Sequence, residues 1–265
     1  MLSKQIVQPA HRAASVFKQG LQIMATNPSW LAFTVAATVV YGVTFPIISA
    51  TIFSNLYSHV FSTVDQVAPH KFASILGIVT FTVFYASLIS AYFSCATAAS
   101  VFAQLDSKPI PLFEGLKQVG RHFGRVTKFA LLSVFLFPMG IYAQRRKLPR
   151  GILGVLGSSF TLHMPQMAPA ILTTHKPMGA TVRDTIGTLG ESWREGLILK
   201  IGMYVVIFII FVLPKLVQHG FFHGPTANTI GWLVSLELAA SSYVIFKVIY
   251  SIFTSVLYYR AKNKK

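Results

Sequence analysis

Long apolar stretches alternate with short basic ones along this chain, and the pattern is clearest between Lys71 and Lys128. The run 72–105 carries no charged side chain. A helix needs about 20 apolar residues to cross the roughly 30 Å of a bilayer's hydrocarbon core, and a longer one tilts or overhangs. The run therefore predicts a membrane-spanning helix.

Small side chains recur within this run at spacings of three and four residues. They are Ser87, Ala91, Ser94, Cys95, Ala98 and Ala99. Small faces let membrane helices approach closely, so we expect this helix to be the central packing partner of the bundle.

The segment 112–128 that follows is amphipathic. Its apolar positions at helical spacing are Leu112, Leu116, Val119, Phe123 and Val126, and its basic positions are Lys117, Arg121, Arg125 and Lys128. Such a helix suits a position on the membrane surface. The four basic side chains are therefore predicted to contact anionic lipid head groups.

The same reading along the whole chain predicts six spans, at 30–54, 72–105, 129–143, 151–173, 201–213 with its flanks, and 230–259. Neither 55–70 nor 217–228 contains Lys or Arg, so we place both loops outside. The tip 145–150 is strongly basic and conflicts with an outside position. The hairpin 129–173 therefore either spans against the positive-inside rule, which we prefer, or is re-entrant.

Two further segments are predicted to be surface helices, at 1–29 and 175–200. The first is basic, and its apolar positions predict a helix ending near Asn27 and Pro28. It also resembles a mitochondrial presequence in charge and amphipathicity, which leaves a targeting role as an alternative.

The order of a surface helix and two spans recurs at about 8–105, 110–173 and 180–259. The chain is thus expected to be a single all-α membrane domain, 1–265, built from three pseudo-repeats.

Composition excludes an ordinary soluble domain. The chain of 265 residues is 53% hydrophobic and 11% charged, whereas soluble domains carry about 25% charged residues. The basic residues behind its net charge of +16 cluster beside apolar runs, so binding to anionic lipids explains them better than binding to nucleic acid.

The topology predicts a bacterial inner-membrane protein with both termini cytoplasmic. A single cysteine, Cys95, excludes an intrachain disulfide.

The segment around His163 and Gln166, which is interrupted by prolines, is the first candidate for a substrate or metal site. Interrupted helices at membrane depth form substrate sites in transporters. Met164 and Met167, with Cys95, would suit a soft metal. The simpler interpretation is a kinked packing helix whose polar groups satisfy freed backbone carbonyls, and we expect no metal or cofactor.

Glu237 and Lys247 are the ionisable residues of the last predicted span. Ionisable residues inside membranes are costly and mark functional sites by default. Lys247 can instead extend its ammonium to the inner interface, and Glu237 can lie near the outer one. His219 and His223 are four residues apart but lack a third zinc ligand nearby in sequence.

No catalytic signature is present. The glycines at 151–157 lack the Lys and Ser/Thr of a phosphate-binding loop, and the chain has only seven acidic residues. We therefore expect a non-enzymatic protein.

Several short motifs resemble a family of uncharacterised prokaryotic integral membrane proteins, catalogued only as a domain of unknown function. They are Gly20-Leu21 with Pro28, Ala91-Tyr92-Phe93 through Ala98, Gly115-Leu116, Ser192-Trp193, and Val256-Leu257-Tyr258-Tyr259-Arg260. The resemblance implies a six-helix membrane fold and brings no known activity.

The expected partners are therefore membrane lipids with anionic head groups, other membrane proteins or a second copy of the chain, and not nucleic acid. The alternative function is a small transporter or channel with a pathway near His163, Gln166 and Glu237. An enzyme acting on lipid is a third hypothesis, without a nucleophile and base to carry it.

Overall fold

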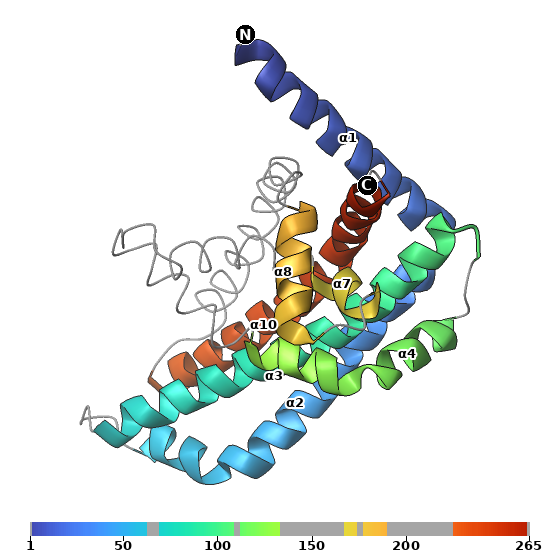
Figure 1. Ribbon diagram of the computed structural model, residues 1–265. Helices are drawn as coiled ribbons and strands as arrows, with labels where there is room; N and C mark the ends of the chain where they lie inside the picture. The colour runs from blue at the N-terminus through green and yellow to red at the C-terminus, as the bar shows by residue number, and fades with distance from the viewer. Residues whose placement is uncertain are drawn as a thin grey trace.

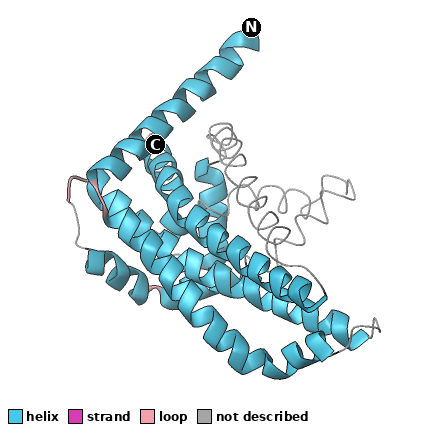
Figure 2. Ribbon diagram, turned by 180° about the vertical axis from the view of Figure 1, so that it is seen from behind, coloured by secondary structure: helices cyan, strands magenta, loops and turns pink. Residues whose placement is uncertain are grey.

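The computed structural model describes residues 2–62, 69–108, 112–132, 167–173, 177–189 and 225–263, and within these ranges the only regular element is the helix (Figure 2). The helices are α1 (Leu2–Thr26), α2 (Ser29–Ser62), α3 (Pro69–Leu105), α4 (Leu112–Arg121), α7 (Met167–Thr173), α8 (Met178–Leu189) and α10 (Pro225–Lys262). Residues 123–132 are also helical. The predicted all-α class is confirmed for these parts of the chain.

Three of these helices are long and apolar enough to cross a membrane. The spanning stretches are Ser29–Ile48 in α2, Gly77–Leu105 in α3 and Glu237–Lys262 in α10. They correspond to the first, second and last predicted spans, and they make the chain a membrane-embedded protein. The predicted spans 129–143, 151–173 and 201–213 lie largely outside the described residues, so the second and third pseudo-repeats are described only in part.

Helix α3 is the centre of the bundle. It packs against α2, α4, α7 and α10 (Figure 1). All six small residues predicted to mediate packing are buried, and Cys95 and Ala98 are fully inaccessible. The prediction that this helix is the central packing partner is confirmed. Its lack of bulky side chains at these positions is what lets several helices approach it at once.

The three long helices lie side by side, and α2 runs in the opposite direction to the other two (Figure 1). Helix α2 runs antiparallel to α3, because Ser29 meets Ser100 near one end and Phe45 stacks on Phe81 towards the other. Helix α10 runs parallel to α3, because Ser94 donates to the carbonyl of Lys247 and Phe102 packs on Tyr258 further along both helices.

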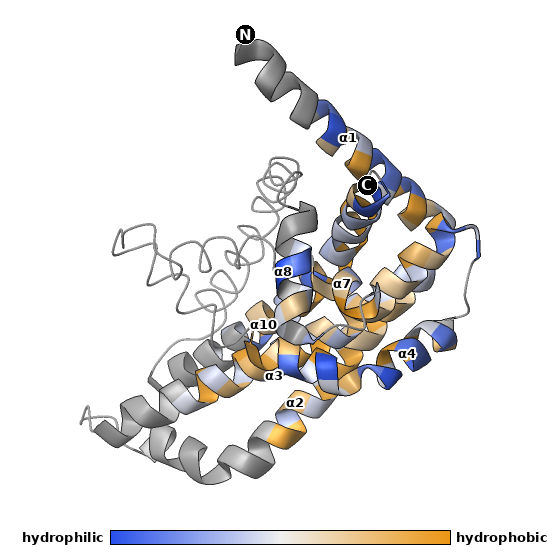
Figure 3. Ribbon diagram, in the orientation of Figure 1, coloured by the Kyte–Doolittle hydropathy of each residue, from blue (hydrophilic) through white to orange (hydrophobic). Residues whose placement is uncertain are grey.

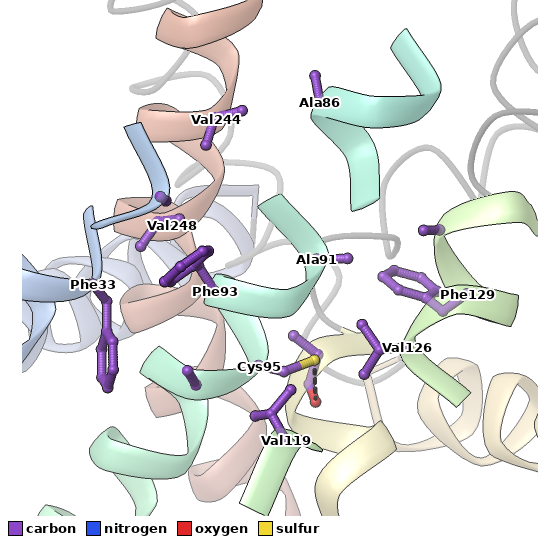
Figure 4. Close-up of a cluster of buried hydrophobic side chains, with 14 of the residues drawn as sticks. Phe33, Ala86, Ala91, Phe93, Cys95, Val119, Val126, Phe129, Val244 and Val248 are labelled. Atoms are coloured by element: carbon purple, nitrogen blue, oxygen red, sulfur yellow. Dashed lines mark hydrogen bonds between the residues drawn. The ribbon is translucent and has the colours of Figure 1, made fainter. Parts of the chain in front are cut away.

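A cluster of buried apolar side chains joins α2, α3 and α10 to α4 and α7. Figure 4 shows Phe33, Phe93 and Val248 on one side of α3 and Val119, Val126 and Phe129 on the other. Between them the thiol of Cys95 lies 3.8 Å from the carbonyl oxygen of Ala168. Because both sides of α3 are covered, its middle is enclosed by protein.

The outer face of α2 remains uncovered within the described structure. Its exposed side chains at four-residue spacing are Leu31, Val35, Val39, Val43 and Ile47. Figure 3 shows hydrophobic colour on the long helices and hydrophilic colour on much of α1, α4 and α8. An apolar stripe of this length on a spanning helix suits contact with lipid tails.

Helix α1 lies across the carboxyl end of α10 and extends beyond it (Figure 1). It buries Ala13, Val16 and Ile23, and Phe17 stacks on Phe253 at 5.2 Å between ring centroids. Arg260 reinforces the crossing, with Nη1 donating to Ser15 Oγ at 2.6 Å and Nε donating to Gln19 Oε1 at 2.8 Å.

The corner between α1 and α2 is closed by polar contacts. The backbone N–H of Ser29 donates to Asn27 Oδ1 at 3.0 Å, so the Asn27 side chain satisfies one of the unpaired N–H groups at the start of α2. Trp30 Nε1 donates to the carbonyl of Met24 at 2.7 Å. The predicted end of the first helix near Asn27 and Pro28 is therefore confirmed.

Candidate functional site

Helix α4 is the first candidate site. Glu114 in its first turn and Arg121 in its last turn both complement the helix dipole. At His122 the helix is interrupted, because the N–H of His122 donates to the carbonyl of Val119, three residues back, at 2.9 Å. The chain then continues as helix over 123–132.

The inner side of this segment is locked to the bundle. Val119 and Val126 are fully buried in the central cluster. The hydroxyl of Tyr92 on α3 donates to the carbonyl of Leu116 at 3.3 Å. Because both the backbone and the side chains of this segment are held against the bundle, α4 forms a fixed platform. Phe113 and Phe123 are exposed, at 81% and 54%, and flank this platform as apolar surface.

Lys117, Arg121 and Lys128 are exposed on the other side of the segment. Among the described residues, no carboxylate pairs with any of the three. They are thus available to an external anion.

Arg125 differs from its three basic neighbours. It is only partly exposed, and its guanidinium donates from Nη1 to the carbonyl of Ile171 and from Nη2 to Thr181 Oγ1, both at 3.3 Å. It connects the end of α7 to α8. The four basic residues that the sequence grouped as lipid contacts are therefore three surface cations and one that makes internal contacts.

Glu237, the first residue of the spanning stretch of α10, is the second candidate site. Its Oε2 lies 3.5 Å from the hydroxyl of Tyr41 on α2. Its Oε1 is inaccessible and has no hydrogen-bond partner among the described residues. Tyr41 is itself fully buried. One oxygen of the carboxyl group therefore meets a hydroxyl, and the other is buried without a hydrogen-bond partner among the described residues.

Aromatic rings form the wall behind Tyr41. Tyr41 stacks on Phe45 at 5.2 Å between centroids, and Tyr85 of α3 lies 5.9 Å from Tyr41. The hydroxyls of Tyr85 and Thr44 are hydrogen-bonded to each other. The site thus holds a few hydroxyls among apolar rings.

Lys247 is separate from this site. Its ammonium lies 5.3 Å from the centre of the Tyr243 ring on the same helix, an arrangement that cation–π attraction stabilises. Ten residues of helix separate it from Glu237, which is about 15 Å along the axis. The two predicted ionisable residues are not brought together.

Other predicted site residues are placed only in part. His163, Gln166, Met164, His219 and His223 lie outside the described residues. Met167 is buried in the same cluster as Cys95. Within the described ranges no group of three His, Cys, Asp or Glu side chains converges to hold a metal ion.

Tyr41 is the site residue that sequence reasoning missed. Its signal was the spacing of aromatic residues, with Tyr41 and Phe45 four apart in one span and Phe81 and Tyr85 four apart in the next. That spacing places two aromatic pairs on helix faces. It does not say that the faces meet or that Glu237 joins them.

The short motifs of the sequence lie at helix crossings. Gly20 faces Phe253, Tyr92 contacts Leu116, and Arg260 holds α1. Ser192-Trp193 lies outside the described residues.

No family model matches the chain, and no curated protein and no solved structure matches it either, so the family resemblance stays a prediction.

Proposed function

We propose that this chain is a non-enzymatic, multi-pass protein of the bacterial inner membrane that gathers anionic lipids at the surface of α4. Its termini face the cytoplasm in this proposal, and its six spans carry three surface helices. The observation that carries the proposal is the set of exposed cations, Lys117, Arg121 and Lys128, on a segment whose opposite side is locked to α3.

Rigidity is what distinguishes this surface from an ordinary solvated charge cluster. A lysine or arginine near an anionic membrane contributes about 1 kcal/mol to binding. Because Val119 and Val126 fix the segment to the bundle, all three exposed charges are carried by a backbone that is held in place. Exposed Phe113 and Phe123 add apolar surface that suits the boundary between head groups and acyl chains.

Charge reversal tests the proposal. The variant Lys117→Glu/Arg121→Glu/Lys128→Glu is expected to bind anionic lipid about 100-fold more weakly, because about 3 kcal/mol of attraction is lost. Purified protein is titrated with phosphatidylglycerol, and the bound lipids are counted by native mass spectrometry. Binding of zwitterionic phosphatidylcholine should not change.

Arg125→Gln is the matched control, because Arg125 belongs to the same basic series but points into the protein. It should retain phosphatidylglycerol binding while its thermal unfolding midpoint falls, since Ile171 and Thr181 lose their donors. Unchanged lipid binding in the triple variant would contradict the proposal, as would an equal loss in Arg125→Gln.

A second candidate function is a small transporter or channel. The observation in its favour is Glu237, whose carboxyl group lies within a spanning helix beside a buried tyrosine. The predicted pathway residues His163 and Gln166 belong to this alternative. Flux of protons or small cations into liposomes, abolished by Glu237→Gln, would favour it over lipid gathering.

A further inference from the structure

We propose that Glu237 is a proton-binding site inside the membrane-spanning part of the protein, with its proton held on Oε1 and exchanged with water at the side of the bundle opposite α1. In the neutral acid, Oε2 is the carbonyl oxygen and accepts from the Tyr41 hydroxyl. This inference does not depend on lipid binding at α4. For the transport alternative, it names the proton as the species that the protein would bind.

The charge balance around Glu237 is the first argument. An ionised carboxylate in an apolar environment needs a cation or several donors. Helix α2 supplies one hydroxyl, from Tyr41, and α3 supplies the ring of Tyr85 behind it. The nearest basic residue on α10 is Lys247, about 15 Å away along the axis. One long hydrogen bond of 3.5 Å does not compensate a buried charge.

The other helices that pack on α10 bring no described charge to Glu237. Arg260 meets α1 at the far end of α10, and Asp184 of α8 acts on Tyr258 near the same end. Arg125 is engaged with α7 and α8. Protonation removes the charge that none of these groups neutralises.

A metal cation fits the site less well than a proton. Hard cations such as Ca²⁺ take six to eight oxygen ligands, and Mg²⁺ needs an octahedral set. The described residues offer the carboxyl group and the Tyr41 phenol. A proton needs only one lone pair, which the unpartnered Oε1 provides.

The position of Glu237 along α10 allows its proton to exchange with water at the membrane boundary. Tyr259 hydrogen-bonds to the exposed Asp106, and we place one boundary of the hydrocarbon layer at this charged side chain. Glu237 lies 22 residues away on the same helix, or about 33 Å at 1.5 Å per residue. A hydrocarbon layer about 30 Å thick that starts at Tyr259 therefore ends close to Glu237. Exchange with water at that second boundary requires no path through the bundle.

A hydrophobic carbodiimide tests the proposal directly. Its nitrogen takes the acid proton while the carboxylate oxygen attacks the central carbon, and the O-acylisourea rearranges to a stable N-acylurea without losing an atom. Ionised, water-exposed carboxylates react poorly with it. Full-length protein in lipid nanodiscs is treated with dicyclohexylcarbodiimide at neutral pH, and the modified residue is mapped by peptide mass spectrometry.

We expect one adduct, at Glu237, which decreases reversibly as the pH is raised. It should be absent from Glu237→Gln and retained in Glu114→Gln, a control that alters an exposed carboxylate of α4. Tyr41→Phe should keep the adduct, because the apolar surroundings and the ring stacking remain. Mapping on the unmutated protein makes the result independent of whether a variant folds.

Infrared spectroscopy provides the second readout. The carbonyl band of a neutral carboxylic acid should be present at neutral pH and missing from Glu237→Gln. No adduct at Glu237, labelling that does not change with pH, or a missing acid band would overturn the proposal. Phosphatidylglycerol binding of Glu237→Gln should stay unchanged, so a failure here leaves the α4 proposal standing and the reverse also holds.

Discussion

Ala96→Leu is expected to lower the free energy of unfolding by about 3 kcal/mol, at the upper end of the usual cost of overpacking a filled core. Ala96 is fully buried in the central cluster, on the part of α3 where small side chains let other helices approach. A leucine there has to push a neighbouring helix outward. Unfolding of purified protein with increasing sodium dodecyl sulfate, followed by circular dichroism, measures the change.

Ala32→Leu is the matched control. Ala32 is exposed on α2, beside the lipid-facing stripe that begins at Leu31, so the added side chain enters lipid or detergent and not the core. We expect its unfolding curve to coincide with that of the unmutated protein. Equal curves for the Ala96 and Ala32 variants would show that α3 is not tightly enclosed.

Gly20→Leu is expected to detach α1 from α10 and to cost about 2 kcal/mol. A Cβ atom at Gly20 would lie 2.5 Å from the Phe253 ring. That ring is buried and stacked on Phe17, so it has little room to move. Detachment is measured by maleimide labelling of Ala13→Cys, in a background with Cys95→Ala. Ala13 is 2% exposed, so labelling should be slow with Gly20 and at least tenfold faster with leucine.

Gly42→Leu tests whether glycine replacement alone has this effect. Nothing lies within 4 Å of a Cβ at Gly42 on α2, and leucine favours helix more than glycine does. Labelling of Ala13→Cys should therefore stay slow. Fast labelling in both glycine variants would mean that α1 is loosely attached regardless of Gly20.

The spanning helices were largely predictable, and their ends were less so. A long charge-free run identifies α3 because the bilayer requires apolar length, whatever the packing. Helix α2 was expected to end at Ser54 but continues to Ser62. Nothing in 55–62 forces a helix to stop, because the segment contains neither glycine nor proline.

The basic segment shows where periodicity fails. A single uninterrupted helix over 112–128 places Arg125 on the same face as Arg121 and Lys128. The tight turn at His122 changes the phase, since one three-residue hydrogen bond replaces the regular four-residue pattern. Arg125 is thereby directed towards α7 and α8. Gly120 and Gly124 flank the turn, but isolated glycines are tolerated inside helices and did not by themselves indicate it.

The contact between Glu237 and Tyr41 was out of reach for another reason. The two residues are 196 positions apart, and their meeting depends on how α2 and α10 cross beside α3. Sequence identified Glu237 because a charge inside a span is costly anywhere in it. The partner depends on tertiary packing, which a one-dimensional pattern does not encode.

The directions of the long helices also impose a parity rule on the topology. Because α3 and α10 run in the same direction, a predicted topology has to place an odd number of crossings between Leu105 and Pro225. Both interpretations of the hairpin 129–173 obey this rule, because a re-entrant loop removes two crossings together. The total is then even, so we expect Thr26 and Lys262 to face the same compartment, and reporters fused beyond them test this expectation.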